Sequence, residues 1–366
     1  KANPNLAICK ILFSLGAGAE VSSLGELKTA LKVGFEPNNI LFVGPGKTEE
    51  EILYAVNNGI YALVAESVEE IQLIENTAEK LGKQVNVLLR INTIERPKVS
   101  PEIMVGGPSK FGFDEESVID QLSSIRMQYV KPIGIHVYSA SQILDSDFIC
   151  EHLQNVLQLS LRLSGEIGFQ LKCTDFGGGF GVPYHPGEKE LELQKISDEA
   201  KRLLEEYRPF ISNCRLIFEI GRFLVAEAGI FVTRVIRIKE SRGKYFIITD
   251  GGINHLTRPA FMGVNHPVRI LNKITSENQS EYEICGPSCT PLDVIGTRVR
   301  LPMPEEGDII GIFNVGAYGY TMSMVNFLSF GWPKEIMVDD GKIFVIRKSK
   351  KPEQLFKDQP LPDEIK

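Results

Sequence analysis

The sequence predicts an α/β protein in which a (β/α)8 TIM-like barrel is followed by a mainly antiparallel β domain. Strand-like and helix-like segments alternate through the first two-thirds of the chain, which is typical of a parallel sheet with right-handed crossovers. Polar or glycine-rich residues follow strand after strand at its carboxyl end, where such a barrel carries its active site. From about residue 229, short strand-like runs follow one another with few long helices between them. A doubly wound parallel sheet is the alternative for the first part.

Strand and helix patterns alternate in the first hundred residues. Apolar runs predict buried strands over 40–44, 62–66 and 85–92. Each helix pattern opens on a capping box, a Ser or Thr paired with a Glu three residues later, and stops at a glycine. The boxes are Thr48 with Glu51 and Ser67 with Glu70, and the stops are Gly59 and Gly82.

The same alternation continues to residue 228 and then gives way to strands alone. Further barrel strands are expected at 133–138 and 216–221, and CTDFGGG (173–179) is expected to be a strand that runs into a glycine turn. Helices are expected near 145–164 and over about 188–207. Strand-like runs of the second part are 232–240, 244–252, 281–286, 297–302 and 342–348. We therefore expect a barrel over 1–228, a β domain over 229–348, and a polar, proline-broken tail over 349–366.

Composition restricts the classes of partner. The 366 residues carry a net charge of −7, which disfavours nucleic acid or an anionic membrane as the main partner. Apolar stretches are broken well short of the roughly 20 residues that a membrane helix needs. The six cysteines are scattered, and the spacing of Cys285 and Cys289 is a poor zinc pattern, so we expect no metal site. Reduced thiols and a cytoplasmic location are the interpretation that fits.

Two motifs in the barrel point to chemistry. FGGGFG (176–181) places three glycines after a strand, which suits a phosphate, although a plain glycine turn is the alternative. It matches neither the nucleoside-triphosphate loop nor the dinucleotide fingerprint. FEIGR (218–222) places Glu219 and Arg222 at the rim of the barrel, either as site residues or as a structural salt bridge.

Three further residues each allow a functional and a structural interpretation. Tyr318 in GAYGY (316–320) either donates to a phosphate or packs. Cys289 lies in the Gly- and Pro-containing loop CGPSCTPLD (285–293), whereas a buried, inert thiol is the default for any single cysteine. Lys1 of KANPN is either a frayed end or a reactive amine.

Taken in order, the motifs K-A-N, G-G-G, E-x-G-R, G-P-x-C-x-x-x-D and G-A-Y-G decide between these interpretations. Together they resemble the fold-type III, alanine-racemase-fold decarboxylases that use pyridoxal 5′-phosphate, the family of ornithine and diaminopimelate decarboxylases. The resemblance runs from residue 1 to about 345. The segments EVSSLGEL (20–27), GPGK (44–47) and INHLTRPAF (253–261) also look like this family.

The resemblance implies a role for each motif. Lys1 would bind the cofactor covalently at the end of the first barrel strand, so that strand and a segment pairing into the β domain would precede residue 1. Glu219 would pair with the pyridine nitrogen, where alanine racemases have arginine, and Cys289 from the partner of a homodimer with shared sites would reprotonate the product. Arg258 would bind a substrate carboxylate. The remaining cofactor contacts would be Tyr138, Ser141, Gly177, Gly178, Gly179, Gly221, Arg222 and Tyr318.

Departures from the family pattern bear on the substrate. Tyr138 stands where the family usually has a histidine against the cofactor ring. Thr290 replaces the acidic residue that grips a distal ammonium, and Met262 replaces an acidic or phenolic contact. An unpaired buried ammonium is costly, so ornithine and diaminopimelate are poorly matched. The C-T-P-x-D loop looks closer to the specialised-metabolism branch that decarboxylates carrier-linked glutamate in butirosin assembly or citryl-diaminopropionate in siderophore assembly.

Three functions therefore compete. The first is decarboxylation of an amino acid or amino-acid-derived intermediate, small or carrier-linked. The second is diaminopimelate decarboxylation, favoured by INHLTRPAF and opposed by Thr290 and Met262. The third is a catalytically silent regulator resembling the antizyme inhibitors, opposed by the joint presence of Lys1, Glu219, Arg222 and Cys289.

Overall fold

The computed structural model describes residues 1–97, 102–276, 279–362 and 365, and these form two compact units. The first unit comprises Lys1, residues 8–182 and residues 189–223. The second comprises residues 2–7, 183–188 and 224–366, so the chain passes between the units several times. The domain limits expected from the sequence stay a prediction.

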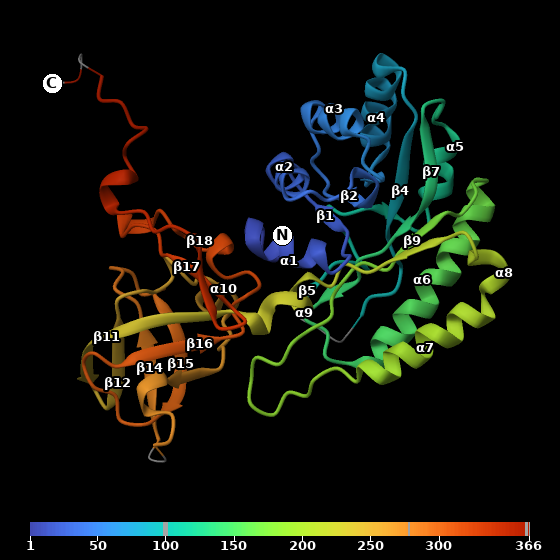
Figure 1. Cartoon of the computed structure of the whole chain (residues 1–366). Helices are drawn as coiled ribbons and strands as arrows, with labels where there is room; N and C mark the ends of the chain where they lie inside the picture. The colour runs from blue at the N-terminus through green and yellow to red at the C-terminus, as the bar shows by residue number, and fades with distance from the viewer. Residues whose placement is uncertain (98–101, 277–278, 363–364, 366) are drawn as a thin grey trace. The chain divides into compact units, whose positions relative to one another are not determined.

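A parallel sheet forms the centre of the first unit (Figure 1). Its strand order is β1-β2-β3-β4-β7-β9-β10, and every neighbouring pair is parallel. The strands are β1 (Ala19–Val21), β2 (Ile40–Phe42), β3 (Ala62–Ala65), β4 (Val85–Asn92), β7 (Val130–His136), β9 (Cys173–Asp175) and β10 (Arg215–Ile217). Short β6 (Phe113–Asp114) pairs with β4, and β5 (Glu102–Ile103) pairs with β8 (Ala140–Ser141).

Helices separate most of these strands along the chain, as the sequence predicts. They are α1 (Leu6–Ser14), α2 (Leu24–Val33), α3 (Glu49–Asn58), α4 (Val68–Leu81), α5 (Val118–Ser123), α6 (Ser146–Ile167), α7 (Leu193–Glu206), α8 (Arg208–Ile211) and α9 (Gly221–Val225). Figure 1 shows α6 and α7 side by side, and the two helices are in contact. Among the described residues, no helix is both long and apolar enough to cross a membrane.

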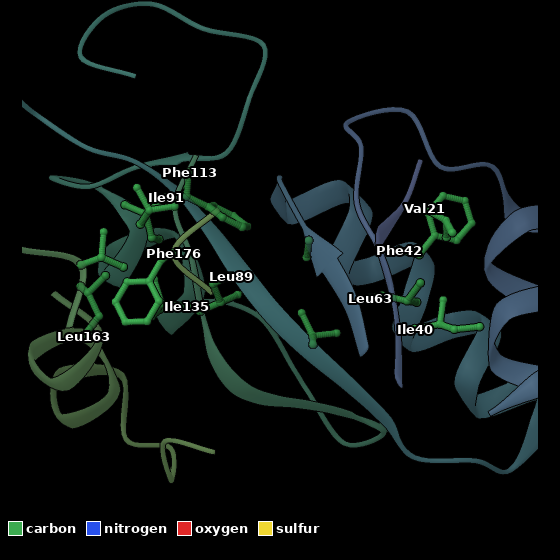
Figure 2. Packing of buried hydrophobic residues seen from close by; sticks show 14 of the residues in the cluster. Val21, Ile40, Phe42, Leu63, Leu89, Ile91, Phe113, Ile135, Leu163 and Phe176 are labelled. Atoms are coloured by element: carbon green, nitrogen blue, oxygen red, sulfur yellow. The ribbon is translucent and has the colours of Figure 1, made fainter. Parts of the chain in front are cut away.

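Strands β2, β3 and β9 are buried on both faces, which is what a parallel sheet between helices and a barrel interior requires. Alternate residues enter different clusters. Ile40, Phe42 and Leu63 pack with helix residues in the larger cluster that Figure 2 shows. Leu41 and Val64, their immediate neighbours, pack in a second cluster on the other face. The period of two follows from the alternation of side chains along a strand.

Local signals fix the ends of α3 as predicted. Thr48 and Glu51 form the complete capping box, and Gly59 closes the helix in the left-handed conformation at φ 66°. Gly82 closes α4 in the same way at φ 61°. A residue with a Cβ is strained at such positions, which explains why both helices stop at glycine.

The second predicted capping box is wrong in one half. The Ser67 hydroxyl accepts from the Glu70 N–H at 3.2 Å, as expected. The Glu70 carboxylate, however, accepts from the N–H of Glu66 at 2.7 Å and from Lys47 Nζ at 2.6 Å. The Lys47 side chain is 1% exposed, and a buried cation needs a carboxylate partner more than the helix end does.

Several predicted strands end earlier than expected: β2 stops at Phe42, β3 at Ala65 and β7 at His136. β9 stops at Asp175 and runs into the predicted glycine turn, where Gly177 and Gly179 take positive φ values of 64° and 102°, outside the β region. β10 stops at Ile217, and Gly221 begins α9. Helix α7 begins at Leu193, later than predicted. Helices α1 and α2 and strand β1 were not expected from the sequence.

The second unit is mainly antiparallel, as predicted. Its six-stranded sheet has the order β13-β16-β11-β12-β14-β15, with only β12 and β14 parallel. The strands are β11 (Ile230–Ser241), β12 (Lys244–Thr249), β13 (Val268–Ile270), β14 (Ser280–Cys285), β15 (Val294–Leu301) and β16 (Ile309–Phe313), with helix α10 (Arg258–Met262) between β12 and β13. β17 (Glu335–Asp339) and β18 (Lys342–Arg347) form a separate hairpin. The core of the six-stranded sheet includes Val235, Ile247 and Ile284.

Candidate active site

Several polar residues at the carboxyl ends of β2, β3 and β4 hold these ends together. Glu66 Oε1 accepts from the N–H of Gly44 at 3.0 Å and from Arg90 Nη1 at 3.1 Å. Glu66 Oε2 accepts from the N–H of Gly112 at 3.2 Å. Asn92 likewise donates to Asp114 at 2.7 Å. This part of the rim is therefore a rigid frame.

A buried cluster of titratable side chains lies at the carboxyl ends of β7, β9 and β10. His136 ends β7, Asp175 ends β9, and Glu219 follows β10 by two residues. His136 Nε2 lies 3.3 Å from Glu219 Oε1, and one polar atom of each of the three side chains lies within 4.8 Å of the others. His136 and Asp175 are fully buried, and the Glu219 side chain is 6% exposed.

The pKa values of the two carboxyl groups of this cluster are shifted in opposite directions. Burial alone would raise the pKa of Glu219, but His136, Arg90 and Lys1 together lower it below its ordinary value. Burial, and then the charge of Glu219, raise the pKa of Asp175 well above its ordinary value, and the N–H of Gly177 offsets only part of this. The arrangement therefore provides one ionised carboxylate, on Glu219, in a buried setting.

The three glycines of FGGGFG allow neighbouring loops to approach closely. A Cβ on Gly177 would lie 2.4 Å from the carbonyl oxygen of Val137, and one on Gly178 would lie 2.2 Å from that of Glu219. A Cβ on Gly179 would lie 2.4 Å from the carbonyl oxygen of Ala140. Each glycine is therefore required, because any side chain would push the strand ends apart.

Arg222 and Ser141 lie near this glycine loop. The Arg222 side chain is 6% exposed, and its Nη2 donates to Ser141 Oγ at 3.1 Å. Arg222 Nη2 also lies 3.6 Å from Glu102 Oε2. A buried guanidinium beside a hydroxyl is a suitable setting for a phosphate.

Lys1 and Tyr138 belong to the same unit. Lys1 Nζ lies 5.5 Å from the centre of the Tyr138 ring, and the Tyr138 ring packs against Gly177 and Gly178 closely enough that a Cβ there would touch it. The first unit therefore contains the predicted residues Lys1, Tyr138, Ser141, Gly177, Gly178, Gly179, Glu219, Gly221 and Arg222.

The second unit contains the other predicted residues, Arg258, Met262, Cys289, Thr290 and Tyr318. Cys289 is exposed, whereas burial and the charge of Asp293 raise the pKa of Cys285 to about 11. Of the two thiols in this loop, Cys289 is therefore the accessible one. The Tyr318 N–H donates to the carbonyl of Ala2, the residue after Lys1, at 2.9 Å.

Asp293 fixes the loop that carries Cys289. Its Oδ1 accepts from the N–H of Ile253 at 2.8 Å, and its Oδ2 accepts from the N–H of Ser288 at 2.7 Å. The Asp293 residue is 2% exposed, so its charge is committed to these backbone groups. The sequence motif contained Asp293, but the sequence did not identify it as a residue of the site.

Arg258 is held in place by a histidine. The guanidinium is stacked on the Tyr184 ring, with Cζ 4.1 Å from the ring centre, and its Nη1 lies 2.9 Å from His266 Nε2. His266 Nδ1 lies 2.9 Å from the carbonyl oxygen of Phe313, which can only accept. Nδ1 therefore carries the proton, and the neutral Nε2 accepts from Arg258.

Glu20 is a further site residue that the sequence did not identify. It is partly buried on β1, and burial and the charge of Glu219 raise its pKa to about 7, against the opposing effect of Lys1. The signal that could have identified His136 and Asp175 as site residues is a titratable residue at the end of a buried strand, whereas Glu20 is the middle residue of β1 and carries no such signal. The expectation of no metal site stays a prediction.

Replacing Glu20 with glutamine should stabilise the protein at alkaline pH. The folded state binds the Glu20 proton more tightly than the unfolded state, so stability falls as pH rises from the ordinary carboxyl value to about 7. One pKa unit corresponds to about 1.4 kcal/mol, and after allowance for solvent screening we expect a gain of about 1 kcal/mol at pH above 7. Thermal unfolding of the cofactor-free variant and the wild type measures this. At acidic pH, Glu20 is protonated in both the folded and the unfolded state. If the variant were more stable than the wild type by the same amount there, the result would contradict this prediction.

Comparisons with known proteins identify the family. The model of the pyridoxal-binding domain of pyridoxal-dependent decarboxylases matches residues 1–226. The L-glutamyl-[BtrI acyl-carrier protein] decarboxylase of Niallia circulans is 38% identical over 358 residues, which cover 95% of this chain and 83% of that protein. The diaminopimelate decarboxylase of Methanocaldococcus jannaschii is 35% identical, over 95% of this chain and 79% of that one.

Solved structures confirm the predicted fold. Diaminopimelate decarboxylase from M. jannaschii in complex with L-lysine has a TM-score of 0.91 at 33% identity and covers 99% of this chain and 83% of that one. The Helicobacter pylori enzyme complexed with L-lysine has a TM-score of 0.88 at 34% identity, over 97% of this chain and 87% of that one. The parallel sheet of the first unit is consistent with a TIM-like barrel, and a separate β unit accompanies it.

The residues described above fit pyridoxal phosphate. The glycine loop is a cradle that a Cβ would fill, Arg222 is a buried cation beside Ser141, and Glu219 is a buried carboxylate whose pKa is lowered. Such residues bind a phosphate group, with its anionic oxygens, and a basic ring nitrogen. This chain belongs to the ornithine, arginine and diaminopimelate decarboxylase family and is a pyridoxal-phosphate-dependent decarboxylase.

Proposed function

We propose that this decarboxylase removes the α-carboxylate of an amino-acid substrate whose far end is acylated, carboxylated or tethered to a carrier. The observation that carries the proposal is the loop of Cys289. Its one carboxylate, Asp293, is buried and committed to two backbone N–H groups, and the next residue after the thiol is neutral Thr290. The loop therefore offers no negative charge to a distal ammonium. The 38% identical relative that acts on a carrier-bound glutamyl group supports the same substrate class.

The proposed cofactor site is formed mainly by the first unit. Bound pyridoxal phosphate supplies the electron sink for the electron pair that carbon dioxide leaves behind. Lys1 binds the cofactor, and Glu219 holds a proton on its ring nitrogen. The Tyr138 ring flanks the cofactor ring, and the phosphate contacts are Ser141, Gly177, Gly178, Gly179, Gly221, Arg222 and Tyr318.

The remaining proposed roles concern the substrate. The Cys289 thiol donates a proton to the substrate carbon after the carboxylate has left, which its exposure permits. Arg258 binds a substrate carboxylate. Thr290 and Met262 contact the far end of the substrate. A cytoplasmic location stays part of this proposal.

We expect the site to be shared between two subunits of a homodimer. Lys1→Ala and Cys289→Ala variants should each be inactive alone, because each lacks one essential group. Mixing them should restore activity, since half of the sites in a heterodimer then contain both intact residues in the shared arrangement. The measurement is carbon dioxide release after subunit exchange, which tagged subunits verify by co-purification. Verified exchange without any recovered activity would contradict a shared site.

The substrate proposal is tested by comparing kcat/KM for four compounds. A citryl-linked diaminopropionate and a glutamyl-carrier thioester should exceed meso-diaminopimelate and ornithine by about 100-fold or more, because an ammonium without a polar partner is strongly disfavoured. Thr290→Asp should narrow this gap by raising kcat/KM for the diamino acids. If meso-diaminopimelate proves the best substrate of the wild type, the lysine-biosynthesis activity replaces the proposal.

Diaminopimelate decarboxylation is the second candidate. The segment INHLTRPAF and the TM-score of 0.91 with the M. jannaschii enzyme favour it. The third function, a catalytically silent regulator, is not supported, because the family comparisons show a pyridoxal-phosphate-dependent decarboxylase. The lowered pKa of Glu219 and the intact glycine cradle support an enzyme instead. The visible absorbance band of bound cofactor, measured on the purified protein, separates an enzyme from such a regulator.

A further inference from the structure

Asp175 is not among the proposed cofactor contacts, although its carboxyl group lies in the buried cluster with His136 and Glu219. It is fully buried at the end of β9, and its Oδ1 accepts from the N–H of Gly177 at 2.9 Å. Its other oxygen, Oδ2, has no hydrogen-bond donor among the described residues. An ionised, buried carboxylate oxygen without a donor is strongly unfavourable, whereas a protonated oxygen is itself a donor.

The partners that such a donor would need lie next to it. One polar atom each of Asp175, His136 and Glu219 lies within 4.8 Å of the others. Glu219 Oε1 and both ring nitrogens of His136 also lack a hydrogen bond among the described residues, although His136 Nε2 is 3.3 Å from Glu219 Oε1. A proton on Asp175 Oδ2 therefore faces acceptors that are themselves incompletely satisfied.

The charges around the cluster favour one negative charge within it. Lys1 and Arg90 act on Glu219 as cations, but the Arg90 guanidinium is already bonded to Glu66. Glu20 adds a further acidic group that faces both Glu219 and Asp175. Two ionised carboxylates this close and this deeply buried would repel each other strongly. The raised pKa of Asp175 and the lowered pKa of Glu219 agree with this conclusion.

Asp175 also connects the two parts of the cofactor site. Its Oδ1 holds the N–H of Gly177, and the carbonyl of the same Gly177 accepts from the N–H of Glu219 at 2.7 Å. We propose that Asp175 is a protonated positioning residue, which donates from Oδ2 within the His136–Glu219 pair and holds the glycine cradle through Oδ1. It thereby keeps Glu219 as the single negative charge of the cluster. This inference rests on the proposed role of Glu219 in binding the ring nitrogen.

Three variants of one position test the inference, with affinity for pyridoxal phosphate as the readout. Asp175→Ala removes both hydrogen bonds and should weaken binding about tenfold or more. Asp175→Asn keeps an acceptor for Gly177 and a donor at the position of Oδ2, so it should restore the affinity to within about threefold of the wild type. Asp175→Ser provides a smaller polar group and should resemble Asp175→Ala. Equilibrium dialysis against pyridoxal phosphate measures all three.

A second measurement reports the proton directly. The infrared spectrum of the wild type at mildly alkaline pH should contain a carbonyl band of a protonated carboxylic acid that Asp175→Asn lacks. Circular dichroism melting shows that each variant is folded. A folded Asp175→Asn that binds as weakly as Asp175→Ala, or an infrared spectrum that is unchanged in this region, would overturn the inference.

The two proposals fail in different ways. If borohydride does not trap the cofactor on Lys1 in the wild type, the proposed cofactor site itself is wrong. If Lys1 is trapped but Asp175→Asn fails to restore affinity, the cofactor site stands and the protonated state of Asp175 is wrong. If Lys1 is trapped and Asp175→Asn restores affinity, both hold.

Discussion

Lys1→Ala should lower kcat by about 10³-fold or more, the scale seen when a residue that forms a covalent bond in catalysis is removed. Lys1 Nζ lies beside Tyr138 in the unit that holds the buried carboxylate of Glu219. Lys47, another lysine near the strand ends, cannot replace it, because Lys47 Nζ is buried and donates to Gly44, Val64 and Glu70. The amine that reaches the cofactor is therefore expected to be Lys1 alone.

Borohydride reduction of the loaded protein, followed by peptide mass mapping, identifies the lysine. The pyridoxyl group should be found on Lys1 in the wild type and should be absent from Lys1→Ala. Lys10→Ala is the matched control, because Lys10 Nζ donates to the carbonyl of Val33, the last residue of α2. Recovery of the pyridoxyl group on a different lysine of the wild type would refute the assignment.

Glu219→Gln should lower kcat by at least about 10²-fold, the effect of losing one preorganised electrostatic contact. The neutral amide cannot hold a proton on the ring nitrogen as the ionised carboxylate does. The loss should fall on kcat more than on KM, because the substrate does not contact this residue in the proposed site. The size of the side chain is unchanged, so the glycine cradle should persist.

The control for this variant is cofactor binding itself. Glu219→Gln should still be trapped on Lys1 by borohydride, although its visible spectrum should differ from that of the wild type because the ring nitrogen loses its charged partner. Turnover equal to that of the wild type would show that Glu219 is not the partner of the ring nitrogen. Loss of trapping together with loss of the melting transition would indicate a folding defect instead.

Local chemistry made much of the fold predictable. The helix ends depend on a few adjacent residues, namely the capping box of Thr48 and Glu51 and the left-handed glycines Gly59 and Gly82. These features can therefore be predicted from the sequence alone. The alternation of Leu41 and Phe42 between two cores follows from strand geometry in the same way. Such elements need no knowledge of distant neighbours.

The unpredicted features depend on partners far apart in the sequence. Glu70 leaves its expected capping role because Lys47, 23 residues earlier, is buried beside it. Helix α1 begins after Asn5, whose side chain accepts from the N–H of Ala7 and donates to Glu335, 330 residues later. In both cases a tertiary contact decides between two locally reasonable arrangements.

The chemistry of the site was predictable only in part. The family motifs named Lys1, Glu219 and Arg222, since each stands in a recognisable stretch. The sequence could not show that Asp175 and Glu219 meet, because 44 residues separate them and only the pairing of β9 with β10 brings their strand ends together. Which of two carboxyl groups is ionised depends on that encounter.

The division of the chain has a consequence for protein engineering. Lys1 belongs to the first unit, but residues 2–7 and 183–188 belong to the second, where Ala2 accepts from the N–H of Tyr318 and Pro183 accepts from Asn314. No single cut in a gene therefore separates the two units. A chimaera joined at residue 224 would place the backbone after Lys1 against a foreign turn at residues 316–318. We therefore expect the substrate range of this enzyme to be altered by exchanging individual loops, such as 285–293, and not by exchanging whole units.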